Sequence, residues 1–175
     1  MVEAEGTRAS TSAGWSIRAM TLEDYDRVYA LWETCAGLGL SAADSRAGIA
    51  ALLGRNPGMS FVAVSGRDIV GSALCGHDGR RGYIHHLAVS TTCRHQGIAR
   101  ALLDRCLNAL ANCGIDKCHA FVYADNEEGA RFWLHVGAAR RVELELFSVY
   151  TPRCDPEADK PTLNAREHPG PSTLP

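Results

Sequence analysis

The fold is decided by the stretch LAVSTTCRHQGIARALL, which spans residues 87–103. Its apolar start, Leu87–Val89, is typical of the end of a buried strand. A polar loop follows, and a basic turn with Gln96 and Gly97 opens directly into the strongest helical pattern of the chain, about 98–113. The first turn of a helix carries unpaired backbone N–H groups and the positive end of the helix dipole. This turn is therefore predicted to bind an anion, and the arrangement suits a pyrophosphate.

Small residues leave room for that anion. Gly97 has no Cβ and Ala99 has only a methyl group, so a phosphate can approach the backbone at both positions. Arg94 and Arg100 add positive charge. The motif is not a Walker P-loop, because no Gly-Lys-Ser/Thr follows, and it is not the GxGxxG of a dinucleotide fold.

Strand and helix periods alternate on both sides of this stretch. The predicted strands are 15–19, 60–65, 69–75, 83–89, 118–123 and 141–150. The predicted helices are one capped by Thr21, one begun by Ser41, the helix at 98–113, and one that Asn126 caps and Gly137 ends. Three meander strands followed by strand–helix–strand–helix–strand predict an α/β fold of the α+β type, with helices covering a mixed sheet.

Both ends of the chain read as tails. Residues 1–13 hold no large apolar side chain beyond Met1 and Val2, and residues 151–175 hold six of the seven prolines. We therefore expect a flexible N-terminal tail at 1–13, one domain at 14–150, and a Pro-rich flexible C-terminal tail at 151–175.

Composition narrows the class of protein. The 175 residues are 46% hydrophobic and 22% charged, which is typical of a globular domain, and the net charge of −2 argues against a nucleic-acid partner. No apolar run approaches the ~18 residues of a membrane helix, and no leader-like segment is found, so no membrane partner is expected. Seven cysteines without CxxC spacing favour free thiols in the cytoplasm. Cys113, Cys118 and His119 leave a zinc site open, but we expect no metal.

Two motifs together resemble the GNAT superfamily of acyl-CoA-dependent N-acetyltransferases, over roughly residues 16–148. The first is Arg-x-x-Gly-x-Ala at residues 94–99. The second is an Asn that opens a helix, then Ala, an aromatic residue and Gly, matched by Asn126, Ala130, Trp133 and Gly137. The segments 32–35 and 76–82 further resemble bacterial YpeA-like acetyltransferases. The resemblance implies a GNAT fold: a mixed sheet of about six to seven strands, about four helices, and a V-shaped opening for acetyl-CoA.

The same resemblance implies acetyl-CoA as co-substrate and an amine acceptor as partner. The implied cofactor-binding residues are Leu87, Ala88, Val89, Arg94, His95, Gln96, Gly97, Ile98, Ala99, Arg100, Asn126, Phe132 and Trp133. In such proteins the backbone amides of residues 96–100 hold the pyrophosphate, and the main chain of Leu87 and Val89 pairs with the pantetheine arm. The Val89 amide would then face the thioester oxygen, as a catalytic donor.

An attacking amine must first lose a proton, and His85 is the predicted base because an unperturbed imidazole titrates near 6.5. Regular strand alternation places Tyr83, His85 and Leu87 on one face and His86 on the other. Tyr83 is the secondary catalytic candidate, and a purely structural His85 stays open as the alternative.

One residue departs from the family pattern, because Trp133 stands where the family usually has a Tyr that protonates the leaving thiolate. An indole cannot serve as an acid near neutral pH, so the acid is unassigned and Tyr123 is a substitute candidate. The expected function is acetyl transfer from acetyl-CoA to a primary amine of a small molecule or protein. The alternatives are an acyl-CoA sensor without turnover and an assembly protein that pairs through its last strand. The resemblance also allows a homodimer.

Overall fold

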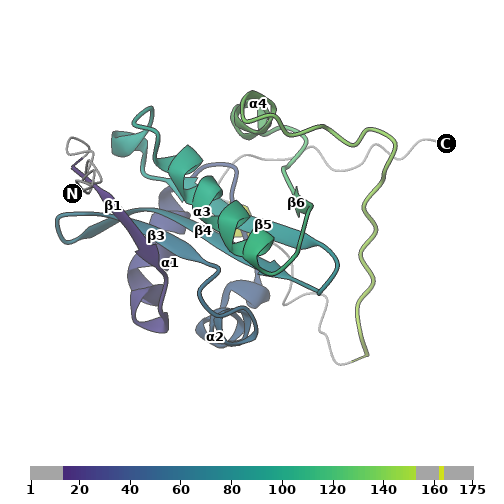
Figure 1. Ribbon diagram of the computed structural model, residues 1–175, viewed down its shortest axis with the longest axis horizontal. Coiled ribbons are helices and arrows are strands. Elements are labelled where there is room, and N and C mark those ends of the chain that lie inside the picture. Colours follow the sequence, from purple (N-terminus) through teal and green to yellow (C-terminus); the bar gives the residue numbers. More distant parts are fainter. Residues whose placement is uncertain (1–13, 153–161, 164–175) are drawn as a thin grey trace, which may run out of the picture.

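The computed structural model describes residues 14–152 and 162–163, and it arranges them around a mixed five-stranded sheet (Figure 1). With η for 3-10 helices, the elements are β1 (Ser16–Ala19), η1 (Leu22–Asp24), α1 (Tyr25–Thr34), β2 (Gly39–Leu40), η2 (Ala42–Asp44), α2 (Arg46–Arg55), β3 (Phe61–Ser65), β4 (Asp68–His77), β5 (Gly82–Val89), η3 (Thr91–Cys93), α3 (Ile98–Asn112), β6 (Cys118–Ala120), α4 (Glu127–His135) and β7 (Thr162–Leu163).

The central sheet has the strand order β1-β3-β4-β5-β6. The first four strands pair antiparallel, and β6 pairs parallel to β5, as a crossover through α3 requires. A separate two-stranded sheet pairs β2 with β7. The predicted α/β class and its mixed sheet are confirmed, with five strands in the central sheet.

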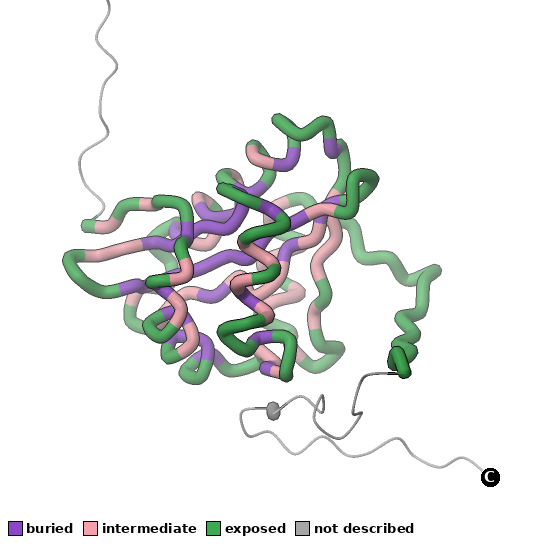
Figure 2. Tube along the Cα trace, turned by 90° about the horizontal axis from the view of Figure 1, so that it is seen from below, coloured by how far each residue is buried: buried purple, intermediate pink, exposed green. Residues whose placement is uncertain are grey.

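Helices cover both faces of that sheet, and the buried positions lie along its central strands (Figure 2). On one face, α1 and α2 pack through Val28, Trp32 and Ile49. On the other face, α3 packs through residues at helical spacing, Ile98, Leu102, Cys106 and Leu110. Partly buried residues of α4 join this second cluster. The cap predicted at Asn126 is confirmed directly before α4. Thr21 and Ser41 stand one residue before the short helices η1 and η2, and the residues directly before α1 and α2 are Asp24 and Ser45.

The strand predicted at 141–150 is wrong: residues 141–150 lie in no strand of the described chain. Figures 1 and 2 show this segment running apart from the sheet. Its alternating apolar side chains are exposed, with Val142 at 84% and Val149 at 92%. An alternating segment forms a strand only where the edge of a neighbouring strand provides hydrogen-bond partners. The neighbouring strand β6 spans only residues 118–120, whereas the sequence predicted a strand at 118–123.

The predicted tails lie mostly outside the described residues, including all of 1–13 and Cys154. Two residues of the predicted C-terminal tail, Thr162 and Leu163, form β7. Within the described part of the chain, no helix combines the length and apolar character that a bilayer span requires.

A buried carboxylate ties α1 to β1. Arg18 donates to both oxygens of Asp24 at 2.6 and 2.7 Å, and Arg27 donates to Oδ1 at 2.8 Å. The Asp24 side chain is 2% exposed. The hydrogen bond from Arg18 lowers the pKa of Asp24 to about 2; burial opposes this shift, and the Thr21 amide and the charge of Arg18 support it.

Asp24→Asn is expected to lower the free energy of unfolding at pH 7 by about 2 kcal/mol, because the unfolded carboxyl titrates near 3.9. This contribution is fully present above that value and is lost as the pH falls toward about 2. Urea unfolding at pH 7 and pH 2.5 measures the difference in the free energy of unfolding between wild type and variant. This difference should be smaller at the lower pH. Asp26→Asn is the control, because the Asp26 side chain is 83% exposed. Equal effects of the two substitutions would contradict the prediction.

Candidate active site

A β-bulge interrupts β5 at the predicted catalytic residues. Leu74 pairs with His85 and Ser72 pairs with Ala88, so His86 and Leu87 together face the single residue Ala73. His86 has a left-handed backbone, with a φ of 47°, and is the inserted residue of the bulge. Left-handed backbone is uncommon for a residue other than glycine, and it costs energy that the surrounding contacts must supply.

The bulge changes which side chains share a face. Leu87 and Val89 pack against the cluster on the α3 side, whereas His86 contacts Trp32 of α1 on the opposite side. His85 stands opposite Leu74, which belongs to the α1–α2 cluster. The prediction that Leu87 shares the face of His85 is therefore wrong, and so is the prediction that His86 points away from it. Regular alternation holds only up to the inserted residue.

His85 and Tyr83 line a pocket of about 200 Å³ together with residues of α2 and the end of β4. Their rings stack with centroids 6.3 Å apart, and Phe121 stacks beside both. Burial lowers the pKa of His85 below its ordinary value, His86 lowers it further, and the carboxylate of Asp44 opposes the shift in part. A neutral imidazole in this pocket has a lone pair available to accept a proton.

His86 forms a side-chain hydrogen bond that the sequence did not reveal. Its Nε2 lies 2.6 Å from Oδ1 of Asp44, the last residue of η2. Burial raises the pKa of Asp44, but the hydrogen bond and charge of His86 and the Ser41 amide outweigh it, so that pKa lies below its ordinary value. Asp44 is thus a carboxylate at neutral pH. Asp44 also completes a capping box with Ser41, three residues before it.

The strands β5 and β6 separate after a short contact. They pair only from Gly82 to Ile84 on β5, so the ladder with β6 stops before the bulge. Beyond it, the β6 side of residues 85–89 has no strand partner within the described chain. The backbone there can pair with an extended ligand as a strand would. The Cys35 thiol donates to the Val89 carbonyl, with sulfur and oxygen 3.9 Å apart. The Ala88 side chain is buried in the α1–α2 cluster.

The turn after β5 is open for an anion. His95 has a φ of 60° and Gly97 a φ of 81°, and α3 begins at Ile98. The first amide of the helix with a protein acceptor is that of Ala101, which donates to the Gly97 carbonyl. In the described part of the chain, no hydrogen bond uses the amides of residues 96–100. No atom lies within 4 Å of where a Cβ of Gly97 would stand. Such a concave run of free N–H groups fits a phosphate group.

The arginines predicted to add charge are already paired. Nη1 of Arg94 donates to both carboxylate oxygens of Glu128 at 2.7 and 2.9 Å, which joins the turn to α4. Arg100 pairs with Asp104 one helical turn along α3, at 2.9 Å. The amides, rather than these guanidinium groups, are thus the groups of this turn without a protein partner.

The predicted residues Asn126, Phe132 and Trp133 belong to the segment of α4, which the pair of Arg94 and Glu128 joins to this turn. Phe132 and Trp133 are partly buried against the α3-side cluster, with ring centroids 5.5 Å apart. Asn126 caps α4 by accepting from the Gly129 amide at 2.8 Å, and its Nδ2 donates to the Gly37 carbonyl at 3.2 Å.

The Tyr123 hydroxyl lies so close to Gly39 that a Cβ there would overlap it. Together with the contact between Asn126 and Gly37, this brings the segment after β6 against the segment that follows α1. Tyr123, the substitute acid candidate, therefore lies next to the α1–α2 connection.

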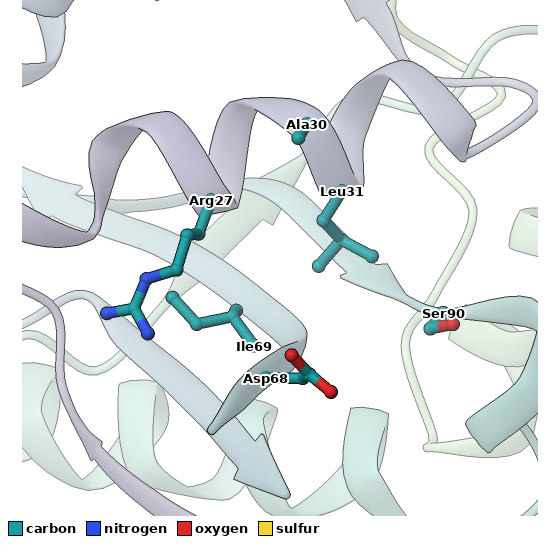
Figure 3. A pocket seen from close by; sticks show the side chains of 6 residues that line it. All are labelled: Arg27, Ala30, Leu31, Asp68, Ile69 and Ser90. Atoms are coloured by element: carbon teal, nitrogen blue, oxygen red, sulfur yellow. The ribbon is translucent and has the colours of Figure 1, made fainter. Parts of the chain in front are cut away.

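A larger hollow, of about 360 Å³, lies between α1 and the start of β4 (Figure 3). Leu31 and Ile69 form its apolar floor, and Arg27 and Asp68 stand at its rim. None of the predicted site residues lines it. His85 is the candidate site, because the titratable pocket, the bulge and the unpaired strand edge meet there within the described residues.

Metal ligation finds no support in the described residues, 14–152 and 162–163. No three His, Cys, Asp or Glu side chains among them are grouped to hold an ion, which includes the cluster considered at Cys113, Cys118 and His119. The described cysteines are free thiols.

The model of the acetyltransferase (GNAT) family matches residues 25–138, and the chain belongs to this family. A curated acetyltransferase of Pectobacterium atrosepticum is 36% identical over 135 residues, which cover 77% of this chain and 91% of that protein. The predicted family is confirmed, and with it the assignment of the chain to the class of N-acetyltransferases.

Solved structures share the fold. Ard1 from Thermoplasma volcanium superposes with a TM-score of 0.63 at 24% identity, over 71% of this chain and 82% of that one. The diaminobutyrate acetyltransferase EctA from Paenibacillus lautus was solved in complex with L-2,4-diaminobutyric acid and coenzyme A. It superposes with a TM-score of 0.60 at 25% identity, over 70% of this chain and 74% of that one.

Proposed function

We propose that this chain transfers the acetyl group of acetyl-CoA to a primary amine of a small molecule or a protein, by direct attack of the amine on the thioester. The observation that carries this proposal is the run of unbonded amides at residues 96–100, beside an open Gly97, after a strand whose β6-side edge is unpaired at residues 85–89 within the described chain. These groups fit a pyrophosphate with an extended arm.

In this arrangement the amides of residues 96–100 hold the pyrophosphate, and the backbone of Leu87 and Val89 pairs with the pantetheine arm. Phe132 and Trp133 line the channel from the α4 side. The Val89 amide donates to the thioester oxygen as negative charge develops there, which is worth about 3 kcal/mol in comparable oxyanion sites.

His85 accepts the proton that the amine loses, because burial keeps its imidazole neutral. The amine nitrogen then bonds to the carbonyl carbon, and the bond from carbon to sulfur breaks. Trp133 cannot protonate the departing sulfur. The thiolate, with a pKa near the ~8.5 of a free thiol, leaves without an acid or takes its proton from Tyr123.

A thiol-release screen tests the proposed function. The chain is incubated with acetyl-CoA and a panel made of L-2,4-diaminobutyrate, Nα-protected lysine and an alanine-terminated peptide, and free coenzyme A is detected with a thiol reagent. Release that depends on one of these amines is expected. Calorimetric binding of coenzyme A with no release across a widened amine library would instead support an acyl-CoA sensor, the alternative that Trp133 keeps open.

The proposed setting is the cytoplasm, supported by the free thiols of the described cysteines. A homodimer stays a prediction, which light scattering with and without coenzyme A would test.

A further inference from the structure

His86 is held from both its backbone and its side chain. Its left-handed backbone forms the bulge, and the Ser72 hydroxyl donates to its carbonyl at 3.5 Å. The same hydroxyl accepts from Nε1 of Trp32 at 2.8 Å. The Trp32 ring in turn meets the imidazole of His86 edge-on, with centroids 4.7 Å apart. Trp32 and Ser72 are both fully buried, so this closed ring of contacts is rigid.

Asp44 completes the arrangement from the opposite segment. One carboxylate oxygen, Oδ2, accepts from the Ser41 amide at 2.8 Å, and the other, Oδ1, lies 2.6 Å from Nε2 of His86. The two side chains are 11% and 16% exposed. A carboxylate can only accept, so Nε2 of His86 carries the proton and donates it to this bond. The bond joins the segment between α1 and α2 to the bulge of β5.

The bulge fixes two catalytic positions at once. His85 precedes the inserted residue, and Val89 follows it by three. A change in the backbone at His86 therefore moves the base relative to the amide that faces the thioester. Displacements of about 1 Å between reacting groups cost up to about 100-fold in rate.

We propose that Asp44 and His86 are positioning residues for acetyl transfer: their hydrogen bond holds the bulge of β5, and so sets His85 and the Val89 amide in register with each other. This inference rests on the proposed function. We assign the proton of the amine to His85 and a positioning role to His86, because Nε2 of His86 is committed to Asp44 and its ring packs against Trp32.

The test compares three variants with wild type, using the panel amine that gives the fastest thiol release. His86→Gly accepts the left-handed backbone but removes the hydrogen bond, whereas His86→Gln keeps an N–H donor at nearly the same reach. Asp44→Asn keeps the shape of the carboxylate without its charge. His135→Gln, which changes an exposed histidine of α4, is the matched control.

We expect His86→Gly and Asp44→Asn to lower kcat by about 10- to 100-fold. The calorimetric Kd for coenzyme A should stay within about twofold, since the turn at residues 96–100 is untouched. His86→Gln should regain a large part of the turnover that His86→Gly loses. A His86→Gly enzyme as fast as wild type would show that only the backbone conformation matters and would overturn the proposal. A His86→Gln enzyme as slow as His86→Gly would overturn it as well.

A spectroscopic measurement keeps the proposal testable even if a variant does not fold. Long-range ¹H–¹⁵N spectra of the wild-type imidazoles should show His86 protonated at Nε2. A neutral ring protonated only at Nδ1 could not donate a hydrogen bond from Nε2 to Asp44 and would overturn the proposal. Failure of the proposed function looks different from failure of the positioning role. In the first case the wild type itself releases no thiol with any amine, and in the second the wild type turns over and the variants match it.

Discussion

Replacing Gly97 by valine is expected to weaken coenzyme A binding by about 100-fold or more, which corresponds to about 2.7 kcal/mol. The Cβ of the new residue would stand in open space, with no atom beyond its chain neighbours within 4 Å, at the turn proposed to hold the pyrophosphate. A β-branched residue also resists the φ of 81° found at this position. Isothermal titration of coenzyme A into the variant measures the loss.

Gly114→Val separates the two effects of that substitution. Gly114 lies just past the other end of α3, with a φ of 73° and open space around its Cβ position, so the same side chain meets the same kind of backbone strain there. Both variants should lose about 1 to 2 kcal/mol of folding free energy. Only Gly97→Val should lose affinity, and unchanged affinity in that variant would refute the placement of the pyrophosphate.

His85→Gln is expected to lower kcat with the panel amine by about 100-fold or more, the usual contribution of a general base. The variant keeps the size of the side chain but cannot take up a proton. In wild type the base is active when neutral, and the pKa of His85 lies below its ordinary value because of burial. The acidic limb of the pH–rate profile should therefore fall below the ~6.5 of free imidazole, with activity rising as the pH increases through it.

In His85→Gln that limb should disappear, while coenzyme A binds as in wild type. Tyr83→Phe is the companion variant, because it keeps the aromatic ring that stacks on His85 and removes only the hydroxyl. It should keep the acidic limb in place. A wild-type pH profile in His85→Gln would remove this residue from the mechanism and leave its role structural.

Local patterns in the sequence predicted the elements around the turn at residues 94–97 well. The strand before residue 90, the small residues at 97 and 99, and the helical period after 98 are all features of neighbouring residues, and the structure assembles them as a strand, an open turn and α3. The same holds for the cap at Asn126, since a cap depends on contacts a few residues away.

Features that depend on distant residues were missed. The pairing of Arg94 with Glu128 joins residues 34 apart, and that of His86 with Asp44 joins residues 42 apart. An extra residue in a strand has no signature in alternation, so the face of His86 was predicted wrongly. The segment 141–150 alternates well, yet alternation says nothing about whether a partner edge exists.

The bulge also makes the length of β5 as critical as its side chains. Losing one residue between Tyr83 and Val89 would restore strict alternation and carry one of the two histidines through to the α3 side. Residues 78–81, by contrast, lie outside the ladder, where Asp78 accepts from the amides of Arg80 and Arg81 in a local turn. Insertions and deletions can thus accumulate in that turn during divergence, while the spacing from Tyr83 to Val89 must be inherited intact.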